Sequence, residues 1–336
     1  MRVAFHSNQL CLRGTEVALF DYAKYNQSIL GNESFIIYDA NNKSNNPLAI
    51  ESFKKQFHVR GYNDFSEVDN IIKKEKADFC YMIKSGERDG KFPKSCRVGI
   101  HVVFQYYQPH GDIYAYISEW LTNKMTGGKY PFVPHIIDMP ISESRDLRKE
   151  LNIPKSAIVF GRHGGESEFN LPFVHKAVEC VARRYPKDVY FLFLNTDPFC
   201  PSLPNIIHLP ATSSLQEKTD FILACDAMIH AREKGEIFSM SVGEFLFHDK
   251  PVISWVGGED EGHHCMLKDK GLWYKDYDEA YRHMTNFDWF RARPMGVYKK
   301  LVKQYSPMKV MKKFDQVFLS PKKSFMAKII EKVFKR

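Results

Sequence analysis

Long apolar runs are absent from this chain of 336 residues. No stretch approaches the roughly 18 consecutive apolar residues that a transmembrane helix needs. The N-terminal sequence MRVAFHSNQL also lacks the apolar segment of a secretory signal peptide. We therefore expect no membrane-spanning helix and a cytoplasmic location.

Paired cysteines and the common nucleotide motifs are also missing. The seven cysteines are scattered and odd in number, and no two of them form a CxxC pair. This pattern is typical of reduced thiols in a protein interior. The first strand-like segment is not followed by GxGxxG, and the chain contains neither a P-loop motif nor GxSxG. These absences argue against NAD-binding, P-loop and α/β-hydrolase enzymes.

A convincing metal-binding pattern is lacking as well. Asp276 and Asp278 imitate an Asp-x-Asp metal motif, but they stand just before a helical pattern, where aspartate commonly caps a helix. His263, His264 and Cys265 stand in a row without spaced partners, which is atypical of zinc sites. We expect no metal ion and no other cofactor.

Excess positive charge is confined to the C-terminal end. The formal net charge is +8, and residues 299–336 alone carry an excess of ten positive charges. The rest of the chain is therefore slightly acidic, which is not typical of a nucleic-acid-binding surface. We expect no nucleic-acid partner.

The last residues, 321–336, combine lysines with apolar residues at helical spacing. The apolar members are Phe325, Met326, Ile329, Ile330, Val333 and Phe334. A basic amphipathic helix of this kind can lie on an anionic membrane surface. An ordinary C-terminal helix packed on the body of the protein is the alternative.

What the chain does contain is a regular alternation of strand and helix patterns. Apolar residues make up 44% of it, and its length predicts two domains. In the first half, the predicted strands are RVAFHS, SFIIYDA, ADFCYMIKS and CRVGIHVVF. Helical patterns between them indicate a parallel α/β sheet that is covered on both faces.

A second series of the same kind follows. Its predicted strands are SAIVFGRH, VYFLFLNTD, NIIHLP, AMIHA and KPVISWV. We therefore predict an α/β protein with two Rossmann-like domains, residues 1–139 and 140–295. A helical segment around 296–320 is expected to pack back across the junction.

Two glutamates dominate the segment HAREKGEIFSMSVGEFLFHDKPVIS. Glu236 lies in a loop after the predicted strand AMIHA, and Glu244 lies in the early turns of the next helix. Open α/β sheets bind ligands at the carboxyl ends of their strands, and a helix N-terminus favours phosphate or sugar oxygens. The two carboxylates suit the two ends of one extended ligand. The alternative is one capping and one solvated glutamate.

This segment resembles the donor-binding segment of retaining glycosyltransferases of family 4, which have the GT-B fold. The match comprises Glu236, Phe238, Glu244, Phe245 and the run Lys250-Pro251-Val252-Ile253. GT-B implies two Rossmann-like domains that face each other across a cleft.

The resemblance assigns roles to this segment. It implies that Glu236 contacts the donor sugar and that Glu244 holds the ribose. It also implies that the backbone of Ile237, Phe238, Ser239 and Met240 meets sugar or phosphate, although Ser239 and Met240 depart from the family pattern.

The first domain carries part of the resemblance. LRGTEVALFDYA is similar to the family's glycine loop before the first helix, which implies that Gly14 and Thr15 lie near the donor phosphate and the acceptor. CRVGIHVVF is similar to a strand that ends in a histidine beside the reacting sugar, which implies this role for His101. The alternatives are His110, Asp112, or a structural histidine.

The second domain begins with FGRHGGESEF, where the family carries an arginine and then a lysine for the donor diphosphate. Arg162 matches the arginine, but the lysine position falls near Ser167 and no lysine lies between Lys155 and Lys176. Backbone N–H groups of Gly164 and Gly165, or the charges of Arg232 or Lys234, are candidate replacements.

The nucleobase-contacting loops of the family fall on LNTDPF and HLPA in this chain. The resemblance therefore implies that His208 and Leu209, with Pro210, lie near the base.

Together these features predict a metal-independent retaining glycosyltransferase. It would transfer a sugar from a nucleotide-sugar donor, UDP- or GDP-linked, to a glycan, lipid-linked or protein-linked hydroxyl. Glu236, His101 and Arg162 are the predicted catalytic residues. The alternative, raised by the missing lysine, is a non-catalytic sugar-nucleotide-binding protein of the same fold.

Overall fold

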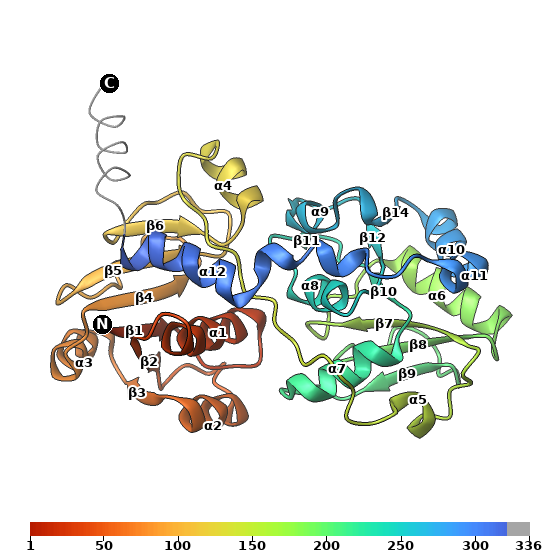
Figure 1. Ribbon diagram of the computed structural model, residues 1–336, viewed down its shortest axis with the longest axis horizontal. Helices are drawn as coiled ribbons and strands as arrows, with labels where there is room; N and C mark the ends of the chain where they lie inside the picture. Colours follow the sequence, from red (N-terminus) through yellow and green to blue (C-terminus); the bar gives the residue numbers. More distant parts are fainter. Residues whose placement is uncertain (321–336) are drawn as a thin grey trace. The chain divides into compact units, whose positions relative to one another are not determined.

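The computed structural model describes residues 1–320. The chain forms two compact units (Figure 1). Unit 1 consists of Met1–Ile136 and the C-terminal stretch that begins at Tyr305, and unit 2 is Ile137–Gln304. The sequence placed these divisions at residues 139 and 295.

Unit 1 is built on a six-stranded parallel sheet in the order β3-β2-β1-β4-β5-β6. Its strands are β1 (Arg2–Ser7), β2 (Glu33–Asp39), β3 (His58–Tyr62), β4 (Phe79–Lys84), β5 (Arg97–Val102) and β6 (Ile113–Tyr116). The central strands are almost entirely buried, as expected for a parallel sheet with helices on both faces.

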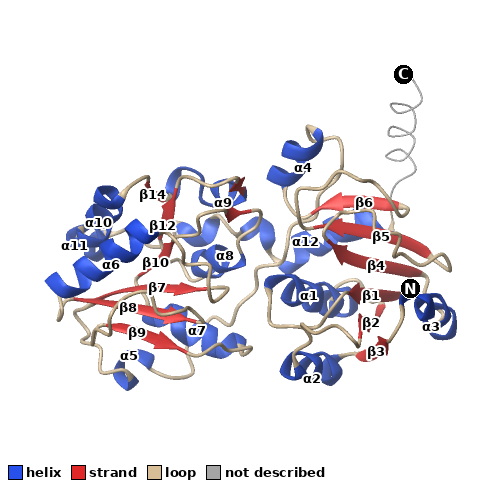
Figure 2. Ribbon diagram, turned by 180° about the vertical axis from the view of Figure 1, so that it is seen from behind, coloured by secondary structure: helices blue, strands red, loops and turns tan. Residues whose placement is uncertain are grey.

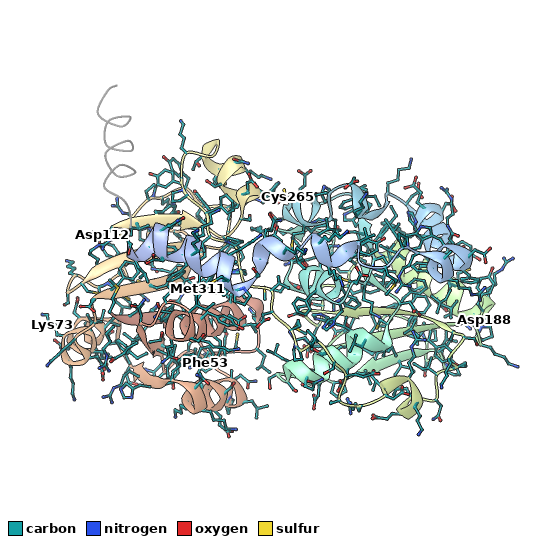
Figure 3. The ribbon with its side chains drawn as sticks, viewed as in Figure 1. Phe53, Lys73, Asp112, Asp188, Cys265 and Met311 are labelled. Atoms are coloured by element: carbon teal, nitrogen blue, oxygen red, sulfur yellow. The ribbon has the colours of Figure 1, made fainter. Side chains whose placement is uncertain are left out.

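The helices of unit 1 come from both ends of the chain. They are α1 (Gly14–Ser28), α2 (Pro47–Gln56), α3 (Val68–Glu75), α4 (Glu119–Thr126) and α12 (Pro307–Phe314). Helix α12 packs beside α1, and Figure 3 shows Met311 on it. The Phe314 ring stacks on Phe5 and Tyr22, with ring centroids 6.2 and 5.3 Å apart. The chain therefore ends its described part in the core of the unit where it began.

Unit 2 contains a second six-stranded parallel sheet, in the order β14-β12-β10-β7-β8-β9 (Figure 2). Its strands are β7 (Ile158–His163), β8 (Val189–Leu194), β9 (Ile206–Leu209), β10 (Ala227–His230), β12 (Val252–Trp255) and β14 (Leu272–Tyr274). A separate two-stranded ribbon pairs β11 (Gly235–Glu236) with β13 (Asp260–Glu261). The predicted α/β class with two parallel sheets is confirmed.

Helices cover both faces of this second sheet. They are α5 (Leu147–Glu150), α6 (Pro172–Arg184), α7 (Leu215–Ala224), α8 (Met240–Phe247), α9 (Gly262–Leu267), α10 (Tyr277–Thr285) and α11 (Phe287–Ala292). Ile158 and Phe160 of β7 face a core shared with α6, α10 and α11. Gly161 faces the opposite way, toward Cys225 and Phe245 at α7 and α8. Successive side chains of β7 thus point alternately to the helix layers on the two faces of the sheet.

Some elements differ from the sequence expectations. The helical segment expected around 296–320 is broken into two short 3-10 turns, α12 and a final turn, Asp315–Leu319, because Pro307 begins a new helix instead of continuing one. Asp276 accepts a hydrogen bond from the Glu279 backbone N–H at the start of α10, so its predicted capping role is confirmed.

Two sequence-based expectations concern membranes. None of the helices within residues 1–320 has the length and apolar character that crossing a bilayer requires. The predicted membrane-binding helix at 321–336 lies outside the described residues.

Candidate functional site

Charged side chains gather at the carboxyl ends of β7 and β10, in the centre of the unit 2 sheet. The strand order reverses there, since β8 follows β7 on one side while β10 lies on the other. In open α/β sheets this reversal leaves a crevice at the carboxyl edge, where ligands usually bind. The loops after β7 and β10 are therefore the first place to seek a site.

Arg162 lies near the end of β7 and is buried, with 5% of its surface exposed. Its guanidinium donates to the Thr196 hydroxyl at 2.6 Å and to the Gly165 carbonyl at 2.8 Å. Burial lowers the pKa of Arg162 to about 10, which still leaves it charged at neutral pH. Within residues 1–320, no carboxylate pairs with it directly. Arg162 thus holds a fixed positive charge that neutral oxygens orient.

The loop after β7 begins with Gly164, whose φ of +155° is unfavourable for other residues. Asn195 donates from its side-chain amide to the Gly164 carbonyl at 2.8 Å. A Cβ on Gly164 would lie 3.0 Å from the Arg162 guanidinium. Gly164 therefore lets the loop backbone pass close to the Arg162 guanidinium.

Arg232 links two acidic residues across the site. One terminal nitrogen lies 2.7 Å from Glu236 Oε2, and the other lies 2.9 Å from Glu168 Oε1. The Glu236 side chain is 15% exposed, whereas that of Glu168 is 40% exposed. Arg232 was one candidate replacement for the missing lysine, and it is the cation in contact with Glu236.

Backbone geometry fixes the position of Glu236. Gly235, just before it, has φ +78°, and a Cβ there would lie 2.2 Å from the Asp260 carbonyl oxygen. Residues Gly235 and Glu236 pair with Asp260 and Glu261 in the short ribbon. Only glycine fits this close approach, so the pairing and the Glu236 position depend on it.

The environment of Glu236 disfavours its charge. Burial raises the pKa of Glu236 above its usual range, and nearby Arg232 and His263 offset this only in part. His230 Nε2 lies 3.7 Å from Glu236 Oε1. The His230 ring packs against His263, with centroids 4.9 Å apart, and burial lowers the pKa of both rings to about 3. Two neutral histidines therefore support the Glu236 side of the site.

Glu244 lies on α8 and is more deeply buried. Lys218 Nζ on α7 donates to Glu244 Oε1 at 2.7 Å, and His163 Nε2 on β7 lies 2.9 Å from Oε2. Burial opposes ionisation of Glu244, but Lys218 and His163 outweigh it and lower its pKa to about 2. The two glutamates of the segment thus have opposite electrostatic environments.

The start of α8 lies between the two glutamates. Ser239 is its N-cap, and its hydroxyl accepts a hydrogen bond from the Val242 backbone N–H. Ser239 and Phe238 are buried, while Ile237 and Met240 are partly exposed. The sequence predicted this helix and its start within a residue or two.

Three other predicted donor-binding residues belong to this unit, namely His208, Leu209 and Lys234. The ring of His208, at the end of β9 beside Leu209, stacks on Phe193 and places Nδ1 2.9 Å from the Thr196 carbonyl. The Thr196 hydroxyl also accepts from Arg162, so Thr196 links His208 to Arg162. Lys234 is different, because its side chain is 60% exposed and lies 4.0 Å from Asp260.

The remaining predicted residues belong to unit 1. Gly14 and Thr15 form the first turn of α1, rather than a loop ahead of it. The next residue, Glu16, is buried and accepts hydrogen bonds from Ser7 and Gln9.

His101 lies in the interior of unit 1. It has no exposed surface, and its two ring nitrogens lie 2.6 Å from the Tyr81 hydroxyl and 2.9 Å from the Val133 carbonyl. Burial lowers the pKa of His101 to about 3. This placement corrects the expectation of a sugar-facing histidine, because β5 is an inner strand whose side chains are covered on both faces.

The alternatives to His101 also have structural contacts. His110 is buried, with Nδ1 2.7 Å from the Gln108 carbonyl, and Asp112 accepts from the Val98 backbone N–H at 2.7 Å. The sequence did not single out the residues that contact the two glutamates, Arg162 or Arg232, namely His163, Glu168, Lys218, His230 and Thr196. Buried polar residues next to strand ends are the signal that could have identified some of them.

No protein-family model matches the sequence, and no curated protein matches it either. Solved structures do share its architecture over nearly the whole chain. A glycosyltransferase from Rickettsia africae ESF-5 is 14% identical with a TM-score of 0.64, covering 99% of this chain and 97% of that one. Anabaena Alr3699/HepE in complex with UDP-glucose is 12% identical with a TM-score of 0.64, covering 100% of both chains.

Two further structures broaden the comparison. Sucrose-phosphate synthase from Thermosynechococcus elongatus is 10% identical with a TM-score of 0.61, covering 100% of this chain and 99% of that one. A putative UDP-N-acetylglucosamine 2-epimerase from Listeria monocytogenes is 9% identical with a TM-score of 0.60, covering 94% and 96%. At such identities the comparison shows the fold and not the reaction. The chain has the GT-B fold, with two Rossmann-like α/β domains, each built on a parallel six-stranded sheet.

Proposed function

We propose that this protein is a glycosyltransferase that transfers a sugar from a nucleotide-sugar donor to an acceptor hydroxyl. The observation that carries the proposal is the buried Arg162, near the end of β7 and just before the Gly164–Gly165 loop. No carboxylate within residues 1–320 pairs with it directly, although Glu168 and Glu236 are close enough to raise its pKa. This combination suits an anionic ligand that also carries hydroxyl groups. A diphosphate-linked sugar has both features.

In this proposal Arg162 and the backbone of the Gly164–Gly165 loop bind the donor diphosphate. Breaking the bond from sugar to phosphate leaves negative charge on the departing phosphate oxygen. A preorganised guanidinium stabilises that charge, because it is already oriented by Thr196 and the Gly165 carbonyl. No metal ion is needed for this role if a second cation assists.

We propose Arg232 as that second cation. The family lysine is absent near Ser167, whereas Arg232 lies within 3 Å of both Glu168 and Glu236. Glu168 is exposed enough to leave Arg232 when a stronger anion arrives. Arg232 would then serve the diphosphate while keeping its contact with Glu236.

Glu236 is the proposed contact of the transferred sugar, and Glu244 that of the ribose. Carboxylates accept hydrogen bonds from two hydroxyl groups at once, which suits the paired hydroxyls of sugars. The start of α8, after Ile237 and Phe238, lies between them in sequence. Ser239 caps the Val242 N–H, and the backbone N–H groups of Met240 and Ser241, which lack an intrahelical partner, would meet phosphate or sugar oxygens. His208 and Leu209 would contact the base.

The finer assignments follow from the same resemblance. We propose retention of the anomeric configuration, a UDP- or GDP-linked donor, and an acceptor on a glycan or lipid-linked molecule held by unit 1. The solved HepE structures contain UDP-glucose or UDP, which supports a nucleotide-sugar as the first ligand to try. Contact of the 321–336 segment with an anionic membrane would suit a lipid-linked acceptor.

A second candidate is a sugar-nucleotide-binding protein without transferase activity. The missing lysine favours it, because one fewer cation stabilises the leaving phosphate. The two candidates predict the same ligand and differ in turnover. Donor hydrolysis or transfer that Glu236→Gln abolishes would distinguish the enzyme from the binding protein.

The first test is a thermal-shift panel of UDP, GDP, ADP and their sugars. A ligand at 100 times its dissociation constant stabilises the folded state by about 2.7 kcal/mol, which raises Tm measurably. Turnover of any stabilising sugar nucleotide is then measured for wild type, Glu236→Gln and the exposed neighbour Glu233→Gln as a control. Absence of any nucleotide effect would contradict the proposal.

A further inference from the structure

Glu244 does not lie alone at the donor edge of unit 2, because two other elements bring charged or polar groups to it. Lys218 from α7 donates to Oε1 at 2.7 Å, and His163 from β7 lies 2.9 Å from Oε2. The side chains of Glu244, His163 and Lys218 are 3%, 9% and 14% exposed. The three groups therefore form a buried cluster that is separate from the Arg232–Glu236 pair.

Lys218 is the only group of this cluster that carries a positive charge at neutral pH. Burial lowers the pKa of His163, although Glu244 opposes that change, so the ring is neutral in this pH range. His248, just after α8, is close enough for the Glu244 charge to act on it, and burial lowers the pKa of His248 to about 4. Without Lys218, the Glu244 carboxylate, which is 3% exposed, would have only the neutral His163 and His248 rings near it. A buried carboxylate in such surroundings takes up a proton.

The lone pairs of Glu244 leave room for a ligand. A carboxylate offers about four acceptor positions, two on each oxygen. Lys218 engages one on Oε1. His163 Nε2 lies 2.9 Å from Oε2, but no described residue forms a hydrogen bond with Oε2, so acceptor positions remain on both oxygens. Two free positions on one rigid carboxylate match two neighbouring hydroxyl groups. Lys218 is the most exposed of the three, so a ligand reaches the cluster from its side.

We propose that Lys218 is a positioning residue for nucleotide binding, because it holds the Glu244 carboxylate in place as the acceptor for the two ribose hydroxyls. It also cancels a buried negative charge near the place where an anionic diphosphate must bind. This inference rests on the proposed function of the site. It makes α7, which carries no family motif, a part of the donor-binding machinery.

The test compares three variants of the full-length protein. Lys218→Met removes the charge and keeps the length of the side chain, Lys218→Arg keeps the charge, and Lys187→Met on the exposed surface is the matched control. Calorimetric titration gives the Kd of UDP at pH 8 and pH 5, or that of GDP or ADP if wild type prefers it. The pKa of Glu244 is followed in the same proteins by carbon NMR of labelled glutamate.

We expect the Kd of Lys218→Met divided by that of wild type to increase about tenfold from pH 8 to pH 5. At pH 5 the Glu244 carboxylate of the variant takes up a proton, so the ligand loses one hydrogen bond to a charged group. The ratio is the informative quantity, because Glu236 and the phosphate titrate in both proteins. The NMR resonance of Glu244 should titrate well above pH 2 in Lys218→Met only. Lys218→Arg should restore the wild-type pH profile, and Lys187→Met should not differ from wild type.

Two other outcomes have different meanings. If Lys218→Met lowers Tm but its Kd ratio is the same at both pH values, the residue is only structural and the inference is overturned. If wild type binds none of the three nucleotides, the proposed function fails, and this inference fails with it. A shifted Glu244 resonance without any change in Kd also overturns the positioning role.

Discussion

Glu236 combines a carboxylate with surroundings that oppose its charge. Its pKa is raised in the folded protein, so ionisation of Glu236 destabilises the fold at pH values above the ordinary glutamate range. We expect Glu236→Gln to raise Tm, and to raise it more at pH 8 than at pH 5, because the glutamine stays neutral throughout. Arg232 keeps Glu168 as a partner in the variant.

Thermal unfolding of both proteins at the two pH values provides the measurement. If the Tm of Glu236→Gln at pH 8 is equal to or lower than that of wild type, the charge of the buried Glu236 does not destabilise the folded protein. We expect Glu236→Gln to be more stable than wild type and to lack turnover of the sugar nucleotide, because residues needed for activity often reduce stability.

Arg162 gives a second prediction at the residue scale. Arg162→Met should weaken nucleotide binding by about tenfold to a hundredfold, the range for one charge-assisted hydrogen bond. Arg162→Lys should restore little, because an ammonium cannot reproduce the fork that meets Thr196 and the Gly165 carbonyl. Arg183→Met, on the surface of α6, is the control. Calorimetry that finds equal Kd values for Arg162→Met and wild type would contradict the diphosphate role.

The sequence could indicate some site residues and not others, for physical reasons. Arg162, Glu236 and Glu244 follow predicted strands or begin a helix, so their place at one sheet edge follows from topology. Lys218 could not be found in this way, since periodicity gives the face of α7 but not the residue 26 positions away that it meets. His101 does lie near the end of its strand, as predicted, but its position in the strand pattern does not show that its ring is buried inside unit 1.

At the scale of elements, the ribbon of β11 and β13 is the feature that positions Glu236. Gly235→Ala should destabilise the protein and weaken nucleotide binding, because its Cβ would meet the Asp260 carbonyl at 2.2 Å. Gly31→Ala is the matched control, since Gly31 has a similar φ of +68° and open space around it. The Tm loss of Gly31→Ala measures only the backbone strain of an alanine at positive φ, about 1 kcal/mol or more. Any further loss in Gly235→Ala comes from the contact with Asp260. Equal Tm losses in the two variants would show that the close approach does not matter.

Several elements were not foreseen from the sequence. Strand β3, HVRGY, lies at the sheet edge with polar and exposed residues, so it lacks the apolar run that marks an inner strand. Helix α2 has a clear start, because Asn46 accepts from the Leu48 backbone N–H just before Pro47. The pair Asn46-Pro47 is a helix-start signal that the sequence itself contains.

At the scale of the whole molecule, the chain returns to the unit where it began. Phe314 is fully buried against Phe5, Tyr22 and Tyr81 of unit 1. Phe314→Ala should reduce the free energy of unfolding of unit 1 by about 3–5 kcal/mol, the usual cost of removing a buried phenylalanine ring. Met308→Ala is the control on the same helix, because Met308 is 65% exposed. Denaturant unfolding that finds both variants equally stable would contradict a core role for α12.

The two-domain architecture was largely predictable, and its boundaries less so. Strands that alternate with helices identify two parallel sheets, because the continuous apolar run of each strand indicates that both of its faces are buried. The division at Ile136 and the return at Tyr305 depend on which core a segment joins. Such long-range contacts leave no periodic signal in the sequence.

The central claim is that the loops after β7 and β10 of unit 2 bind a nucleotide-sugar. Hydrogen exchange followed by mass spectrometry, with and without the sugar nucleotide that stabilises wild type most, tests this claim directly. We predict slower exchange in residues 161–168 and 231–244, and loss of this protection in Arg162→Met. Unchanged exchange in both segments while the ligand is bound, or protection confined to other parts of the chain, would contradict it.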